Sequence, residues 1–255
     1  MLKTDLNSDL GESFGAYRLG LDGEILKNIT SANIACGWHA GDPVVMEKTV
    51  RLAAEHGVAV GAHPGFPDLM GFGRREMKLS PEEIRAYVLY QLGALGAFAR
   101  AAGTELQHVK PHGALYNIAV RDMSVAAAVC AAARAYSREL IVLAPAKSRM
   151  EEAAEEAGLR FVGEFFADRA YNPDGTLVSR SLSGAVIEDS AAVGARVMQM
   201  VREGTVTCID GTVMPINCGS ICVHGDNAHG VEITALLRRL LEDGGVKICA
   251  MRELL

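Results

Sequence analysis

The sequence has no apolar stretch that approaches the roughly 20 residues of a membrane-spanning helix. It has no basic run interleaved with aromatic residues, and its 255 residues carry a formal net charge of −6, which argues against nucleic acid as a partner. The N-terminus lacks the basic and apolar segments of a secretory signal. We therefore expect a cytoplasmic protein with neither a membrane nor a nucleic acid as its partner.

Several short catalytic motifs are also missing. There is no GxxxxGK[ST] loop, so we expect no Walker-type nucleotide site. Neither GxSxG nor HExxH occurs, which leaves a serine-elbow hydrolase and a local zinc motif unsupported. The cysteines lack CxxC spacing, which predicts buried free thiols. They are Cys36, Cys130, Cys208, Cys218, Cys222 and Cys249.

Short apolar stretches that alternate with helical patterns are the main feature present. Candidate strands lie at 2–9, 31–36, 58–63, 107–112, 140–145, 160–166, 220–224 and 246–250. Candidate helices lie at 43–56, 81–102, 122–136, 147–157, 189–203 and 229–242. This alternation predicts parallel strands joined by right-handed crossovers. With this many units in 255 residues, we expect a single α/β domain over residues 1–255, folded as a TIM-like (β/α) barrel.

Two segments interrupt the alternation of strands and helices. Residues 167–185 are polar and typical of a loop. Residues 205–217 predict a hairpin that turns at Asp210-Gly211.

Polar side chains stand where five of the predicted strands end, and a glycine follows each of them within a few residues. Because the loops after the strands of a barrel converge at one end, these residues are predicted to form one site. We expect the catalytic residues to be Asp9, His39, His63, Lys110 and His112. His224 and Asp226 follow a late strand and are candidates for binding the substrate.

The stretch "DLNSDLGES" places Asp5, Asn7 and Asp9 on one face of the first strand and leucines on the other. The acidic face is predicted to point into the barrel, with Asp9 nearest its mouth. A buried carboxylate needs a cationic or hydrogen-bonding partner, and Lys110 and the histidines are candidates. For Asp5 and Asn7, a purely structural role beneath the site is the alternative.

A divalent metal and metal-free acid–base chemistry both fit these residues. Asp9, His39 and His63 could hold an ion that activates water or polarises a carbonyl. The same side chains could instead act as general acid and base. Their spacing does not decide, because they come from separate strands, and we favour a site without an obligatory, tightly bound metal.

Three arginines lie in glycine-rich or polar loops: Arg74, Arg75 and Arg169. A guanidinium binds a carboxylate through two parallel hydrogen bonds, so these residues predict a small acidic substrate. The alternative is an ion pair within the loop, with Asp68 or Glu76 as the partner.

Long motifs resemble the LamB/YcsF family, and they extend from Asp5 to Asn227. They are "DLNSDLGESFG", "SANIACGWHAGDP", "GAHPGFPDLMGFGRR", "VKPHGALYN", "FADRAYNPDGTLVSR" and "ICVHGDN". The resemblance implies a barrel of the glycoside hydrolase/deacetylase type. It also implies the A component of an ATP-dependent 5-oxoprolinase, which converts 5-oxo-L-proline, ATP and water into L-glutamate, ADP and phosphate together with B and C subunits.

Within this interpretation the partners handle most of the ATP, and a small acidic lactam contacts this chain. The predicted substrate-binding residues are Asn7, Glu12, Arg74, Arg75, Arg169, His224 and Asp226. A homo-oligomer is compatible with the sequence. Two alternatives remain: a stand-alone metal-dependent deacetylase or amidohydrolase, and a non-catalytic subunit that binds the substrate and delivers it to its partners.

Overall fold

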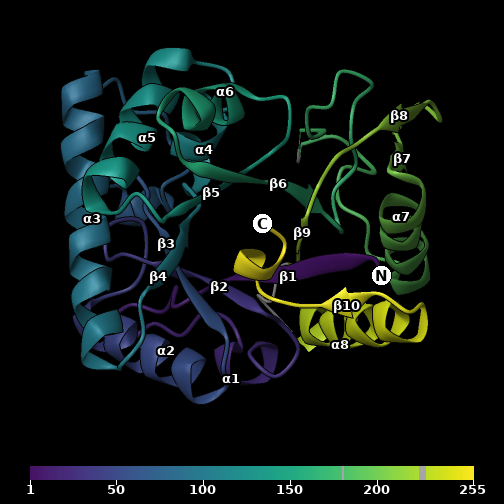
Figure 1. Ribbon diagram of the computed structural model, residues 1–255, viewed down its shortest axis with the longest axis horizontal. Coiled ribbons are helices and arrows are strands. Elements are labelled where there is room, and N and C mark those ends of the chain that lie inside the picture. Colours follow the sequence, from purple (N-terminus) through teal and green to yellow (C-terminus); the bar gives the residue numbers. More distant parts are fainter. Residues whose placement is uncertain (180, 224–227) are drawn as a thin grey trace.

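Seven parallel strands close into a barrel in the computed structural model, which describes residues 1–179, 181–223 and 228–255 (Figure 1). The strands are β1 (Lys3–Leu10), β2 (Ser31–Ala35), β3 (Ala59–His63), β4 (Leu106–Val109), β5 (Ile141–Ala144), β6 (Arg160–Phe166) and β9 (Ser220–Cys222). Pairing of β1 with β9 closes the barrel. The predicted barrel is therefore confirmed, and the predicted residues His224 and Asp226 lie outside the described residues.

The late strand predicted at 246–250 is present but does not belong to the closed ring. It is β10 (Lys247–Ile248), which pairs in parallel with Lys3 and Thr4 at the start of β1. β9 pairs with the next three residues of β1, so β9 and β10 follow one another along the same edge.

Helices surround the barrel, with α2, α3 and α5 on one side of Figure 1 and α7 and α8 on the other. All six predicted helices are present: α2 (Pro43–Glu55), α3 (Pro81–Ala101), α5 (Met123–Tyr136), α6 (Arg149–Glu156), α7 (Ser190–Glu203) and α8 (Ala228–Asp243). Two short helices were not predicted, α1 (Asp22–Ile25) and α4 (Gly113–Ala119). Short 3₁₀ helices also occur at Leu69–Gly71 and Met251–Glu253.

The helix starts follow from local hydrogen bonding. The Asp42 carboxylate accepts from the backbone N–H groups of Val44 and Val45 at the start of α2. At the start of α3, Ser80 and Glu83 form a capping box. These caps satisfy backbone donors that have no partner within the helix.

The two segments that interrupt the alternation lie together beside α7. The predicted hairpin is present, as β7 (Thr205–Thr207) paired antiparallel with β8 (Val213–Pro215). The polar segment after β6 is held by isolated bridges from Arg169 to Val186 and from Tyr171 to Leu177. Residues of both segments line the cavity at the C-terminal end of the barrel, so they help to enclose the site.

The alternation within β1 separates the core from the interior of the barrel. Leu6 and Leu10 are buried in the main hydrophobic cluster. Asp5 and Asn7 are also fully buried, but they bond to polar side chains of other strands. Among the described residues, no helix combines the length and the apolarity needed to cross a membrane.

Candidate active site

The C-terminal end of the barrel opens into a cavity of about 940 Å³. Residues from β1, β3 and β6, from the segments after β3 and β4, and from the polar segment after β6 line it. The predicted residues that line it are Asp9, Glu12, His63, Arg74, Lys110, His112 and Arg169. His39 lies directly behind His112, with the two rings stacked at 3.7 Å. The five predicted catalytic residues therefore gather at one end of the barrel.

A buried lysine between two carboxylates forms the floor of this cavity. Lys110 Nζ lies 3.0 Å from Asp9 Oδ1 and 2.7 Å from Glu164 Oε1. The Tyr116 hydroxyl donates to Glu164 Oε2 at 2.7 Å, and Asn33 Nδ2 donates to Asp9 Oδ1 at 2.8 Å. Two anions thus share one cation inside the barrel.

Burial and charge act in opposite directions on this lysine. Burial favours the neutral amine, but the carboxylates of Asp9 and Glu164 outweigh it and raise the pKa of Lys110 well above its usual value. Burial, together with the Glu164 carboxylate, raises the pKa of the Tyr116 hydroxyl well above normal. Lys110 is therefore a fixed positive charge, and Tyr116 is a fixed hydrogen-bond donor.

Three histidines and Glu12 form a compact cluster next to Asp9. His63 Nε2 lies 3.4 Å from Asp9 Oδ2, and His112 Nδ1 lies 2.9 Å from His63 Nε2. Glu12 Oε1 lies 3.5 Å from His39 Nε2 and 3.8 Å from His112 Nδ1. Burial lowers the pKa of His39 well below normal, and it lowers the pKa of His112 to about 3. His39 and His112 are therefore neutral near pH 7.

One potential ligand atom from each of these four residues lies within 4.8 Å of the others, so the cluster could hold a metal ion. The sequence predicts a metal set of Asp9, His39 and His63. The structure keeps the two histidines, adds Glu12 and His112, and leaves Asp9 out of the set. Asp9 lies at the edge of this cluster. Its Oδ1 is bound by Lys110 and Asn33, and only its Oδ2 faces His63.

Two glycines make room for His39 between the loops. A Cβ at Gly65 would lie 2.7 Å from His39 Nδ1, and one at Gly73 would lie 2.7 Å from His39 Cβ. Gly73 also has a φ of +63°, a conformation that disfavours other residues. The glycines that follow the strands are therefore needed for close packing around the histidines.

A second polar layer lies deeper in the barrel. The Asp5 carboxylate accepts hydrogen bonds from the hydroxyls of Thr30, Ser31 and Ser220. Asn7 Nδ2 donates to Ser220 Oγ at 2.7 Å. Neither Asp5 nor Asn7 is among the residues that line the cavity. The geometry favours a supporting position for the Asn7 side chain beneath the site, and its contact with the substrate stays a prediction.

The three predicted arginines have different surroundings. Arg74 is exposed, lines the cavity and stacks on Phe72, with its Cζ 5.0 Å from the ring centroid. Arg75 does not line the cavity, because its guanidinium is paired with Asp68. Arg169 is buried and donates to the carbonyl oxygens of Ala185 and Val178. For Arg75 the ion-pair alternative is the one observed, and Arg74 is left as the exposed candidate for a carboxylate.

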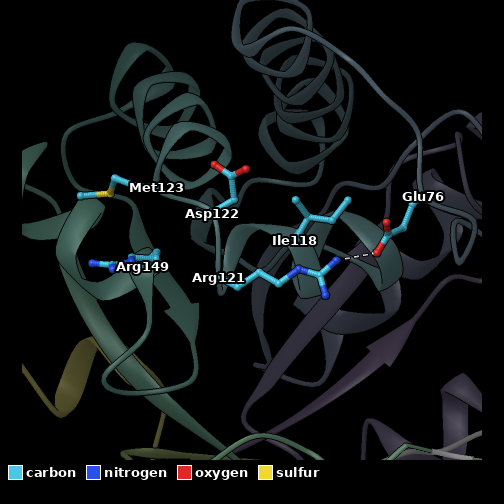
Figure 2. Close-up of a pocket in the computed structure, with 6 residues that line it drawn as sticks. All are labelled: Glu76, Ile118, Arg121, Asp122, Met123 and Arg149. Carbon is cyan, nitrogen blue, oxygen red and sulfur yellow. Dashed lines mark hydrogen bonds and ion pairs between the residues drawn. The ribbon is translucent and has the colours of Figure 1, made fainter.

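A more open pocket of about 650 Å³ lies next to this cavity. Figure 2 shows Arg121 pointing toward Glu76, and the two form an ion pair at 2.6 Å. Asp122 caps α5, and Arg149 pairs with Glu152 at 2.5 Å. Each charged residue that lines this pocket therefore has a partner. The pocket is lined by neither Lys110 nor the histidines of the cluster.

Sequence reasoning missed Glu164 and Tyr116. Glu164 is a lone acidic residue within the apolar strand "RFVGEFF", which was a signal that an inward carboxylate needed a partner. Tyr116 gave no such signal, because it lies on α4, which reads as the loop "PHGALYN".

The fold and the site together define a class of protein. It is a parallel (β/α) barrel that gathers buried acidic, basic and histidine side chains where its strands end, which is where barrel enzymes carry their active sites. The chain belongs to the LamB/YcsF family, whose profile matches residues 4–255. The resemblance inferred from the motifs is thus confirmed.

Similar proteins cover essentially the whole chain. It is 60% identical over 252 residues to the A subunit of 5-oxoprolinase from Pyrococcus horikoshii, with 99% of each chain covered. It is 56% identical over 255 residues to the corresponding 5-oxoprolinase subunit from Alkaliphilus metalliredigens, with 100% of each covered.

Solved structures support the same fold. A lactam utilization protein from Thermus thermophilus matches with a TM-score of 0.94 at 48% identity, covering 98% of this chain and 100% of that one. A T48 deacetylase matches with a TM-score of 0.51 at 14% identity, covering 99% of this chain and 90% of that one. The second similarity concerns the fold alone and agrees with the predicted barrel of the deacetylase type.

Proposed function

We propose that this chain is the A subunit of an ATP-dependent 5-oxoprolinase, which opens 5-oxo-L-proline to L-glutamate together with B and C subunits. The observation that carries the proposal is the paired floor of the cavity, where Lys110 holds Asp9 and Glu164 beside His63. Full-length identity of 60% to the A subunit of a 5-oxoprolinase supports it.

The substrate carries a carboxylate and a lactam, and only the lactam changes during the reaction. Arg74 is suited to hold the carboxylate, because its guanidinium is exposed within the cavity. A handle of this kind places the ring over the reactive side chains. In this arrangement the lactam N–H faces Asp9 and His63 at the floor.

Asp9 has the role of the base in this proposal. Its Oδ1 is engaged by Lys110 and Asn33, and its Oδ2 lies on the side of His63 and the cavity. Removal of the N–H proton by Asp9 moves negative charge onto the lactam oxygen and makes that oxygen a better nucleophile toward the terminal phosphate of ATP. Water then adds to the carbon that carries the phosphorylated oxygen, and the C–N bond breaks as the ring nitrogen takes up protons and leaves as the amine. Hydrolysis of the resulting acyl phosphate by a second water molecule releases L-glutamate and phosphate.

The ATP is proposed to reach this chain from its partners. The sequence contains no phosphate-binding loop of the Walker type. A division of labour follows, in which this subunit binds and deprotonates the lactam while the B and C subunits supply most of the nucleotide contacts.

Reconstitution tests the proposal. We expect the purified chain alone to hydrolyse ATP negligibly, and the complex with B and C to hydrolyse it in the presence of 5-oxoproline with matching release of glutamate. Asp9→Asn should remove this coupled activity, while Asp210→Asn, which changes an exposed hairpin turn, should not. Glutamate release that does not require this chain would contradict the proposal.

The same preparations address the two alternatives. A stand-alone deacetylase or amidohydrolase would release acetate or open cyclic amides without partners or ATP. A subunit that only delivers the substrate would bind 5-oxoproline with unchanged turnover when Asp9 is replaced by Asn.

A further inference from the structure

Backbone carbonyls fix the tautomers of two histidines in the cluster. His63 Nδ1 lies 2.7 Å from the carbonyl oxygen of Lys110, and His112 Nε2 lies 2.8 Å from the carbonyl oxygen of Phe72. A carbonyl oxygen only accepts hydrogen bonds, so both of these ring nitrogens carry the proton. In the neutral rings, His63 Nε2 and His112 Nδ1 are therefore bare, with their lone pairs outward.

These two bare nitrogens face each other at 2.9 Å. Two lone pairs at this distance repel, and nearby carboxylates add to the negative potential. Glu12 Oε1 lies 3.8 Å from His112 Nδ1, and Asp9 Oδ2 lies 3.4 Å from His63 Nε2. Such an arrangement is stable when a cation lies between the lone pairs.

We propose that His63 Nε2, His112 Nδ1 and the Glu12 carboxylate bind one divalent transition-metal ion, with Zn²⁺ as the best match. Two imidazoles and a carboxylate, with a further position open to the cavity, are a usual donor set for a catalytic Zn²⁺. The ring planes of His63 and His112 cross at 89°, so one ion can lie in both planes.

The distances suit this ion. At Zn–N and Zn–O distances of about 2.1 Å, neighbouring ligands of a tetrahedral site are about 3.4 Å apart. The observed separations of 2.9 and 3.8 Å lie on either side of that value. The carbonyl partners of His63 and His112 are the outer-shell acceptors that metal-bound histidines ordinarily have.

His39 has a different part in this site. Its ring is parallel to that of His112 within 3°, so an ion in the plane of His112 lies out of the plane of His39. His39 is fully buried, and neither ring nitrogen has a hydrogen-bond partner among the described residues. Its Nε2 points at Glu12 Oε1 from 3.5 Å, where a small shift lets it donate to the carboxylate. We assign His39 as the positioning residue for Glu12.

The chemical meaning of this site rests on the proposed function, because a bound ion beside Asp9 would act as a Lewis acid on the lactam carbonyl or on a water molecule. Binding of the metal does not rest on it. The test therefore uses the full chain alone, with neither ATP nor 5-oxoproline, and its outcome is independent of the oxoprolinase assay.

The experiment is a metal titration of untagged chain that has been dialysed against a chelator. Co²⁺ serves as the probe, because its visible absorption reports tetrahedral coordination, and Zn²⁺ is then added to displace it. We expect one Co²⁺ per chain, its displacement by one Zn²⁺ as counted by elemental analysis, and a higher melting temperature with Zn²⁺. Failure of the parent to bind either ion would overturn the proposal and would leave a shared proton between the two histidines.

Variants separate this site from adventitious binding. His63→Ala, His112→Ala and Glu12→Gln should each remove the Co²⁺ spectrum and the Zn²⁺-dependent rise in melting temperature. His39→Gln should weaken binding by about 10- to 100-fold, the usual effect of losing an outer-shell partner. His56→Ala is the matched control, because His56 is an exposed histidine at the end of α2 and should change neither readout.

Folding of the variants is checked by circular dichroism before titration. Glu12→Gln keeps the shape of the side chain, so it tests the ligand charge even if an alanine variant misfolds. If Glu12→Gln and the two histidine variants all bind Co²⁺ as the parent does, the metal site is not at these residues.

Discussion

The two polar layers inside the barrel use similar residues and have different properties. The deeper layer contains Asp5 and His108, and the upper layer contains Asp9 and His112, four residues further along the same strand directions. In the deeper layer Asp5 is bonded to three hydroxyls, and His108 Nε2 lies 2.7 Å from Asn33 Oδ1. In the upper layer Asp9 meets a lysine and a histidine beside an open cavity.

The difference lies in charge and access. Burial raises the pKa of Asp5 to about 6, although its hydroxyl partners lower it in part. It lowers the pKa of His108 to about 3. Among the described residues, only neutral groups lie at hydrogen-bond distance from these two side chains, so Asp5 has no cation beside it and His108 is neutral near pH 7. The upper layer is strongly charged and is reached from the cavity, which is what proton transfer requires.

Removal of the charge that holds the upper layer together should have the largest effect. Lys110→Met leaves Asp9 and Glu164 without their cation, and breaking a buried pair in this way costs about 3–5 kcal/mol. Urea unfolding of the purified chain measures this loss. Adding Glu164→Gln should restore part of the stability, because it removes one uncompensated charge.

Lys78→Met, at an exposed position, is the control for loss of a lysine. Equal stability of Lys110→Met and Lys78→Met would mean that the ion pairs at the floor contribute nothing.

Titration of Asp5 in the deeper layer should make the free energy of unfolding depend on pH. The pKa of Asp5 is about 6 in the folded chain, above its ordinary value of 3.8. Between these pH values the folded chain holds a proton that the unfolded chain has lost. The contribution to stability is therefore fully present below about pH 4 and is lost as the pH rises through 6. The loss is about 3 kcal/mol at 1.36 kcal/mol per pKa unit.

Asp5→Asn should remove this slope between pH 4 and 7, as measured by urea unfolding at a series of pH values. Asp210→Asn changes an exposed carboxylate and should keep the slope of the parent. Parallel curves for the parent and Asp5→Asn would show that the pKa of Asp5 in the folded chain is not raised above its ordinary value.

A smaller effect is expected at the cavity next to the upper layer, where the adjacent residues Arg74 and Arg75 can be compared. Arg74→Lys should weaken apparent affinity for 5-oxoproline by about 10- to 100-fold, the worth of a charge-assisted contact of roughly 1.5–3 kcal/mol. The neutral analogue 2-pyrrolidinone should bind equally to the parent and to this variant.

Arg75→Lys is the matched control, because Arg75 is paired with Asp68 outside the cavity. Substrate titration of the reconstituted complex gives both values. If Arg75→Lys weakens binding and Arg74→Lys does not, the carboxylate handle has been assigned to the wrong residue.

The smallest expected effect concerns packing in the deeper layer. A Cβ at Gly61 would lie 2.0 Å from His108 Nε2, so Gly61→Ala should force the ring to move and cost about 1–3 kcal/mol. At Gly93, on α3, a Cβ meets nothing within 4 Å. Gly93→Ala should therefore stabilise the chain by up to about 1 kcal/mol. Thermal unfolding of both variants distinguishes the crowded position from the open one.

Much of the fold could be read from local patterns. The alternation of strands and helices predicted the barrel, and the Ser80–Glu83 pattern predicted the start of α3. The helix α4 could not be predicted, because Gly113 follows Pro111 and His112 in a stretch with loop chemistry. The seven residues of α4 are too few for a clear helical period. The helix is held by packing against α5 and by the hydrogen bond from Tyr116 to Glu164 of β6.

The sequence predicts which residues lie at the ends of strands. It does not predict which residues of other strands will contact them across the barrel. The pattern of β1 by itself determined that Asp5, Asn7 and Asp9 face inward, because side chains alternate along a strand. Only the tertiary structure decided that Glu164, 155 residues after Asp9 in the chain, shares Lys110 with it. Likewise, only the fold decided that Asp68 holds Arg75, that Arg74 faces the cavity, and that Glu12 joins the histidines. The physical reason is that alternation is set by local backbone geometry, whereas distances between strands depend on how the closed barrel brings distant segments into contact.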